Sequence, residues 1–192
     1  ERRTAVSRQI GRKFPDLPLA DKDGNAVKPD FSQFHETIID FWFKSCPGCI
    51  VEMRQFEEAL KGKEKQIGII SVCIDDSATF KKAMDGVFPA LGFVKTLPNW
   101  HHVLLNYPAK GSSNNHELAN QLAVTGYPSF FVLDKRGIIQ ETPPSAVNYI
   151  KTALNKQNAF VVFLTSRGTW QSKQTWVVLL LSLFIYQLIA NL

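Results

Sequence analysis

Two cysteines in the first third of the chain are the residues best suited to chemistry. Cys46 and Cys49 stand three positions apart in "FWFKSCPGCI", directly after the apolar run of residues 37–43. Residues three apart lie on one face of a helix, so their sulfur atoms can meet. Free N–H groups and the positive dipole at a helix start stabilise a thiolate, so the pKa of Cys46 should fall below about 8.5. We expect Cys46 to be the exposed nucleophile of a redox dithiol.

The two residues between the cysteines suit the start of an accessible helix. Pro47 fits the first helical turn, where the missing N–H of proline costs little. Gly48 has no side chain and should leave the approach to Cys46 open. Ser45, directly before the pair, is small, so we expect the Cys46 sulfur to be well exposed.

Other interpretations of the pair are open at this point. A structural zinc site needs four ligands, but the remaining candidates, Cys73 and the four histidines, lack paired spacing. A purely structural disulfide would close a very small loop and stabilise little. Copper binding through Cys46, Cys49 and one histidine is a further alternative.

An acidic residue interrupts the apolar run that leads to the cysteines. Asp40 lies six residues before Cys46, within "TIIDFWF". A carboxyl group in apolar surroundings has a raised pKa. Such a group can take and return a proton as Cys49 changes between thiol and thiolate. The alternative is an acid at a strand position that faces a polar loop.

A tyrosine and a proline form a second candidate part of the site. Tyr127 and Pro128 stand in "VTGYPSFFVLD", immediately before a predicted strand. A proline at the start of a strand fits a turn that does not extend the hydrogen-bond ladder. A cis bond between the two residues would be rare on sequence grounds alone.

Predicted strands and helices alternate along the chain, which favours an α/β domain whose sheet is covered on both faces. Residues 87–115 are expected to be mostly loop, with a short strand or turn. The predicted elements are a hairpin at 14–27 with its turn at Asp23-Gly24, strands at 37–43, 66–76, 129–134 and 137–142, and helices at 49–61, 77–86 (capped by Ser77), 116–124 and 143–154 (capped by Ser145).

The composition fits one domain with extra segments at both ends. The 192 residues are 45% apolar, carry a net charge of +5 and include three cysteines, too few for a disulfide-stapled scaffold. Residues 1–10 are interpreted as a basic, flexible leader and not as a nucleic-acid arm, because no basic stripe with interleaved aromatics follows.

The C-terminal residues differ from the rest in composition. Residues 176–192 are uncharged and lie at the short limit of about 17 residues for a membrane span, so we expect a membrane segment there. Residues 156–175 are expected to link it to the domain. The alternative is a buried C-terminal helix.

The motifs together resemble the thioredoxin superfamily over residues 11–155. Within it, "GRKFPDLPLADKDGNAV" and "FFVLDKRGII" are similar to the TlpA/ResA-type, AhpC/TSA-related branch. The resemblance implies a thioredoxin-like α/β fold, with a central mixed β-sheet flanked by helices and an N-terminal β-hairpin extension.

The resemblance also assigns roles to the candidate residues. It places Asp40 at the buried acid, Cys46 at the nucleophile and Cys49 at the resolving cysteine of the family. Tyr127 and Pro128 fall at the cis-proline that faces the dithiol and helps to bind extended substrate chain. Substrate-binding candidates are therefore Tyr127, Pro128, Pro47 and Gly48.

The implied function is a thiol-disulfide oxidoreductase that exchanges its dithiol with protein disulfides, with no bound cofactor and no metal. Proteins of this branch are typically extracytoplasmic, membrane-tethered reductants. We therefore expect a monomer on the periplasmic side, an upstream electron-donor protein and no nucleic-acid partner. Alternatives are a copper-binding or redox-inactive thioredoxin-like module and a thiol peroxidase. A peroxidase should carry Thr-x-x-Cys, but Phe43 stands three before Cys46.

The sequence departs from the family at four points. Ser45 stands where tryptophan is common, and the dipeptide between the cysteines is Pro-Gly, whereas thioredoxin has Gly-Pro. Arg54 stands near the family's proline kink, and the apolar segment is C-terminal, although the branch usually anchors at its N-terminus. These departures bear on redox potential and partner more than on reaction type.

Overall fold

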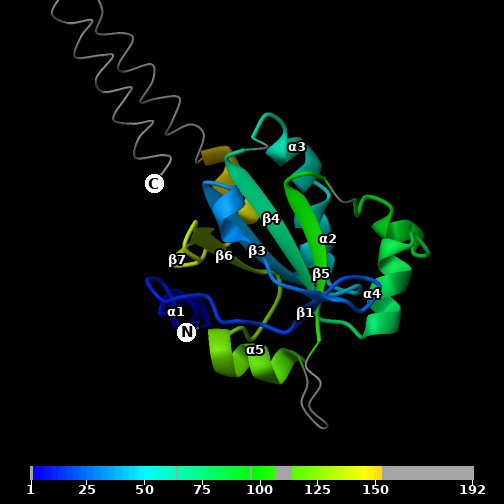
Figure 1. The fold of residues 1–192 in the computed structure, drawn as a ribbon, viewed down its shortest axis with the longest axis horizontal. Helices are drawn as coiled ribbons and strands as arrows, with labels where there is room; N and C mark the ends of the chain where they lie inside the picture. The colour runs from blue at the N-terminus through cyan, green and yellow to red at the C-terminus, as the bar shows by residue number, and fades with distance from the viewer. Residues whose placement is uncertain (1, 64, 96, 107–113, 153–192) are drawn as a thin grey trace, which may run out of the picture. The chain divides into compact units, whose positions relative to one another are not determined.

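The computed structural model describes residues 2–63, 65–95, 97–106 and 114–152, which form a mixed seven-stranded β-sheet with helices on both faces (Figure 1). The strand order is β2-β1-β5-β4-β3-β6-β7. The strands are β1 (Leu19–Ala20), β2 (Ala26–Val27), β3 (Glu36–Trp42), β4 (Ile67–Cys73), β5 (Trp100–Leu105), β6 (Ser129–Asp134) and β7 (Ile139–Glu141). This is the predicted thioredoxin-like arrangement.

Helices and short 3₁₀ turns connect these strands. Residues 146–152 are also helical and follow β7. The other helical elements are α1 (Arg2–Ser7), η1 (Phe31–Gln33), α2 (Pro47–Met53), α3 (Phe56–Leu60), α4 (Ser77–Met84), η2 (Pro89–Leu91) and α5 (Asn114–Leu122).

The three central strands β3, β4 and β5 run parallel, and β6 runs antiparallel to β3. In this register Asp40 pairs with Ser71, and Ser71 pairs with His102. Each of these strands is apolar over most of its length, as expected for strands buried on both faces. Because parallel strands end at the same edge, the ends of β3 and β4 lie together where α2 begins.

Two hydrophobic clusters form the core, one on each face of the sheet, because successive strand residues point to opposite faces. Residues of α2, α3, α4 and the helix 146–152 contribute to the first cluster, and α5 and the segment before β1 contribute to the second. Both cysteines of the CxxC motif belong to the first cluster, together with Ile38 and Trp42 of β3. The first face is therefore the one that carries the candidate site.

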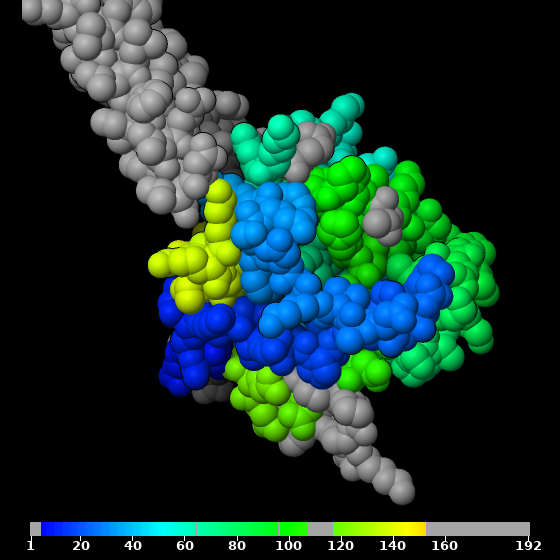
Figure 2. Space-filling view, in the orientation of Figure 1, coloured from blue at the N-terminus to red at the C-terminus, as the bar shows by residue number. Residues whose placement is uncertain are grey.

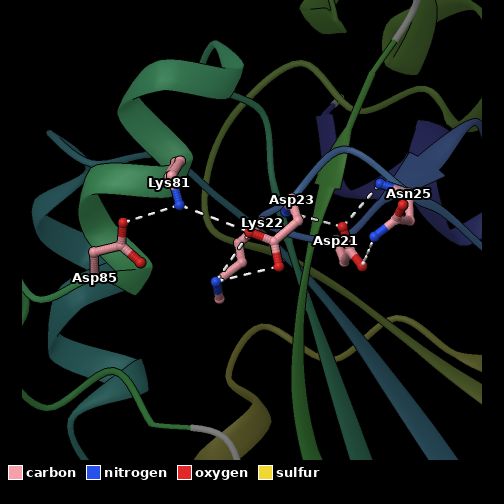
Figure 3. Close-up of polar contacts among 6 residues, drawn as sticks. All are labelled: Asp21, Lys22, Asp23, Asn25, Lys81 and Asp85. Atoms are coloured by element: carbon pink, nitrogen blue, oxygen red, sulfur yellow. Dashed lines mark hydrogen bonds and ion pairs between the residues drawn. The ribbon is translucent and has the colours of Figure 1, made fainter.

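The N-terminal hairpin forms as predicted, with Leu19 paired to Val27. Its turn is closed by Asp21, whose carboxylate accepts hydrogen bonds from both the backbone and the side chain of Asn25 (Figure 3). These bonds lower the pKa of Asp21. Lys81 of α4 lies 3.7 Å from Asp23 in the turn and 3.1 Å from Asp85. In Figure 2 the hairpin, in blue, lies across the front of the molecule.

The helix expected at 49–61 is divided in two. α2 ends at Met53 and α3 begins at Phe56, although no proline stands between them. The break arises because the backbone N–H of Gln55 bonds to Glu52 three residues back, as in a 3₁₀ turn. The cap of α4 also differs: the side chain of Asp76, not Ser77, accepts the hydrogen bond from Thr79.

Two further segments contain structure that bears on their sequence predictions. The region 87–115, expected to be mostly loop with a short strand or turn, contains the short strand β5, which inserts between β1 and β4 and completes the sheet. The leader expected to be flexible begins with α1, and Val6 packs against the second hydrophobic cluster. This packing gives the segment an apolar contact that its basic composition did not suggest.

Residues 1–150 form one compact unit. The predicted linker at 156–175 and membrane segment at 176–192 lie outside the described residues. Within the parts that the structure describes, no helix is long and apolar enough to cross a membrane.

Candidate active site

A disulfide at the first turn of α2 forms the centre of the site. Cys46 and Cys49 are bonded to each other, with their Cα atoms 5.3 Å apart. Cys46 is the N-cap of α2, and the backbone N–H of Cys49 donates a hydrogen bond to its Sγ at 3.2 Å. Pro47 is the first residue of the helix, as predicted, where it leaves no N–H unpaired. The same N–H and the helix dipole would stabilise a Cys46 thiolate after reduction.

The expectation of an exposed nucleophile does not hold for the disulfide form. Cys46 is only 3% exposed, and Cys49 is fully buried. The bond directs the Cys46 sulfur toward Cys49, whose Sγ lies 3.9 Å from the carbonyl oxygen of Phe41 within the core. Pro47 and Gly48, the two residues between the cysteines, are exposed. The start of α2 is therefore accessible at these two residues, whereas the sulfur atoms are buried.

Asp40 is fully buried in the central strand β3. Its neighbours two positions away, Ile38 and Trp42, lie in the same cluster as the two cysteines, so its side chain points to the face that α2 covers. Burial disfavours the charged carboxylate and raises the pKa of Asp40 to about 7. The alternative of an acid facing a polar loop is therefore wrong.

Two polar groups act on the Asp40 carboxyl. The hydroxyl of Ser71 donates a hydrogen bond to Oδ2 at 3.1 Å, which favours the charged form and opposes the effect of burial. The carboxylate of Glu52 on α2 repels the charged form and raises the Asp40 pKa further. Glu52 itself accepts a hydrogen bond from the backbone N–H of Val147, which ties α2 to the start of the helix 146–152. Asp40 can therefore exchange a proton near neutral pH.

The Tyr127–Pro128 bond is cis. Pro128 lies against the start of α2, because a Cβ atom at Gly48 would stand only 3.0 Å from Pro128 Cδ. Gly48 thus allows the close approach of the proline, a role in addition to the open path expected for it. The ring of Tyr127 packs edge-on against Phe43 at 5.5 Å between centroids. The structure brings all the predicted site residues to one end of the sheet.

A hollow of about 460 Å³ opens beside these aromatic rings. Its walls include Phe43, Asp75 just after β4, and residues 124–127, which lead into the cis-proline. The third cysteine, Cys73, lies nearby but is buried in β4, and burial raises the pKa of its thiol. Among the described residues, no three or more His, Cys, Asp or Glu side chains gather as metal ligands would.

The sequence prediction missed Ser71 and Trp100. Ser71 is hydrogen-bonded to Asp40, and Trp100 is hydrogen-bonded to Ser71. Trp100 Nε1 donates to Ser71 Oγ at 2.9 Å, and both side chains are fully buried. Ser71 carried a usable signal, because a hydroxyl interrupts the apolar strand just as Asp40 interrupts β3. Trp100 carried none, since its position depends on the pairing of β5 with β4.

The fold and site define a thioredoxin-like protein with a CxxC disulfide at a helix start and an adjacent cis-proline. The sequence pattern of the AhpC/TSA family matches residues 10–142, more than half of the chain, so the chain belongs to this family. This confirms the resemblance on which the residue roles were assigned. No curated protein matches the chain.

Solved structures share the same fold. The thioredoxin domain of a thiol-disulfide oxidoreductase from Bacteroides vulgatus is 21% identical and matches with a TM-score of 0.58 over 76% of this chain and 96% of its own. A thiol:disulfide interchange protein from a Bacteroides species is 21% identical and matches with a TM-score of 0.59 over 76% of this chain and 88% of its own. A domain of a possible thiol-disulfide isomerase from Cytophaga hutchinsonii is 20% identical and matches with a TM-score of 0.55 over 80% of this chain and 96% of its own.

The raised pKa of Asp40 predicts how stability changes with pH. A carboxyl with a pKa of about 7 in the folded protein and 3.8 when unfolded binds more proton in the folded state between these values. Protonated Asp40 therefore stabilises the folded protein at low pH. As the pH rises from about 4 to 7 this stabilisation is lost, and the free energy of unfolding should fall by up to about 4 kcal/mol. In Asp40→Asn, this fall should vanish in urea unfolding of the oxidised protein. Parallel curves for the two proteins would contradict the assignment.

Proposed function

We propose that this protein is a thiol-disulfide oxidoreductase that exchanges the Cys46–Cys49 pair with disulfides of protein substrates. The observation that carries the proposal is the Cys46–Cys49 disulfide at the first turn of α2, above a buried acid whose pKa is about 7. Membership of the AhpC/TSA family and the shared fold of the oxidoreductase domain from Bacteroides vulgatus support it.

The first chemical step joins enzyme and substrate. In the reduced protein, the Cys46 thiolate attacks one sulfur of the substrate disulfide. A Cys46–substrate disulfide forms, the substrate bond breaks, and the other substrate sulfur leaves as a thiolate that takes up a proton. The N–H of Cys49, which bonds to the Cys46 sulfur in the disulfide form, stabilises the attacking thiolate.

The second step releases the reduced substrate. Asp40 in its carboxylate form takes the proton from the Cys49 thiol, and the Cys49 thiolate attacks Cys46 Sγ. The Cys46–Cys49 disulfide forms, and the second substrate sulfur leaves with the proton that Asp40 returns. Two electrons have passed from the dithiol to the substrate, so a donor protein must reduce the pair again before the next cycle.

The hollow beside the cis-proline suits an extended segment of the substrate protein. Tyr127, Pro128 and Gly48 form a surface next to the dithiol, and an extended peptide laid there would present its disulfide to Cys46. The hollow between Phe43 and residues 124–127 can take one side chain of that peptide.

Replacement of the two cysteines should separate the two steps. Cys46→Ser should abolish the reduction of insulin disulfides, because no nucleophile remains for the first attack. Cys49→Ser should accumulate a mixed disulfide with the substrate, visible by mass spectrometry, because the second step is blocked. Cys73→Ser is the matched control and should keep its activity, since Cys73 lies outside the pair. Full activity in Cys46→Ser would overturn the proposed function.

We further propose that the protein works as a reductant. The family resemblance supports this direction, and the exchange chemistry itself runs both ways. A reductant should have a reduction potential near that of thioredoxin, about −270 mV, when the Cys46–Cys49 couple is equilibrated with glutathione buffers. A potential near about −120 mV would instead indicate an oxidant.

An extracytoplasmic location with a membrane tether is also proposed. It is supported by the TlpA/ResA-type resemblance and by the uncharged residues 176–192. A chain carrying these residues should sediment with membranes and require detergent for extraction, whereas a chain truncated after residue 155 should remain in the supernatant. Equal partition of the two chains would rule out the tether.

A further inference from the structure

A line of polar side chains crosses the sheet face under α2, although the rest of that face is apolar. Asp40 on β3, Ser71 on β4 and His102 on β5 are neighbours in the strand register. On the other side of Asp40, β6 places the apolar Phe130. Asp40, Ser71 and Trp100 are each fully buried. A buried hydroxyl or indole N–H is costly unless it is hydrogen-bonded. The presence of these polar side chains on an apolar face therefore needs a specific reason.

The direction of each hydrogen bond follows from the chemistry of the groups. The indole N–H of Trp100 can only donate, so Ser71 Oγ accepts it at 2.9 Å. Ser71 has one hydroxyl hydrogen, which is then directed to Asp40 Oδ2 at 3.1 Å. The chain of donors therefore runs from Trp100 through Ser71 to one oxygen of the carboxyl, and each bond strengthens the next.

The other carboxyl oxygen is left without such a bond. Asp40 Oδ1 is buried and has no hydrogen-bond partner among the residues that the structure describes. A buried acceptor without a partner is unfavourable, and here it lies in the one carboxyl that the proposed reaction uses. The two oxygens of Asp40 are thus in different environments, Oδ2 held by a donor and Oδ1 open.

We propose that Ser71 and Trp100 are positioning residues for Asp40: they hold Oδ2 as a hydrogen-bond acceptor and leave Oδ1 to exchange the proton of Cys49. The inference rests on the proposed function and names residues that the proposed function does not include. The donors act on the reaction through Asp40. They favour the ionised carboxyl that burial opposes, and so keep enough carboxylate at neutral pH to accept a proton.

The other groups facing this carboxyl act in a different way. Glu52 on α2 repels its charge. Cys49 on α2, in the same hydrophobic cluster as Ile38 and Trp42, is the proposed proton donor. His102 is uncharged near neutral pH, because burial lowers its pKa to about 4. The centroid of its ring lies 4.8 Å from that of the Trp100 ring, and its Nε2–H donates a hydrogen bond to the carbonyl of Lys95. His102 therefore supports the indole without adding a positive charge.

The test compares Ser71→Ala, which removes the donor, with Ser71→Thr, which keeps a hydroxyl. Thr37→Val is the matched control, since it removes a buried hydroxyl of β3 that has no hydrogen-bond partner among the described residues. The Asp40 carboxyl is titrated in each oxidised protein by carbon-13 NMR. Ser71→Ala should raise its midpoint by about one pH unit. Trp100→Phe should raise it by less, and Ser71→Thr and Thr37→Val should leave it unchanged.

The rates of the two chemical steps provide the second readout. In Ser71→Ala, resolution of the mixed disulfide by Cys49 should slow several-fold at pH 7 and recover at higher pH, while the attack by Cys46 keeps its rate. An unmoved Asp40 midpoint in Ser71→Ala would overturn the inference, as would an equal loss in both steps at every pH. The titration needs no substrate. If the wild-type protein reduced no disulfide, the proposed function would fail, although the midpoints would still test the hydrogen bonds.

Discussion

The burial of one carboxyl group in the central strand of the sheet is the constraint on which the site depends. Asp40 is fully buried on the face covered by α2, where a charge is strongly disfavoured. No cation among the described residues offsets this cost. The protein allows the carboxyl to hold a proton up to about pH 7, and it provides one hydroxyl donor to the charged form. The result is a group that can accept or release a proton at neutral pH.

The fold brings the sulfur chemistry to this group. The parallel strands β3 and β4 end together, and the chain leaves β3 to start α2 only a few residues later. The cysteines therefore lie at a helix start, where an N–H bonds to the Cys46 sulfur, and above the face that holds the acid. The cis-proline packs on Gly48 from the beginning of β6. Three separate segments thus meet at one end of the sheet.

The sequence predicts the site residues that interrupt a pattern. Asp40 breaks an apolar strand, the cysteines follow that strand directly, and the Tyr127-Pro128 pair precedes another strand. The hairpin and its turn were also predicted, because a strand-turn-strand pattern is local. Features that depend on contacts between distant segments were not. The pairing of Trp100 with Ser71 requires the β4–β5 register, which no short stretch of sequence contains.

Other differences have equally specific causes. The strand β5 was expected only as a short strand or turn without bounds, because two histidines and flanking prolines obscure its apolar residues. The break between α2 and α3 occurs without a proline, through a change in hydrogen bonding at Gln55. The burial of Cys46 follows from its bond to Cys49, and the spacing of the two cysteines could not show which way the first sulfur turns.

The central claim is that the buried carboxyl serves the second cysteine. The most direct measurement is the rate at which Cys49 resolves a preformed Cys46–substrate disulfide, followed from pH 5 to pH 9 in the wild-type protein and in Asp40→Asn. The account predicts a wild-type rate that rises with a midpoint near 7, and a much slower variant in which this midpoint is lost. Superimposable pH profiles would contradict the account.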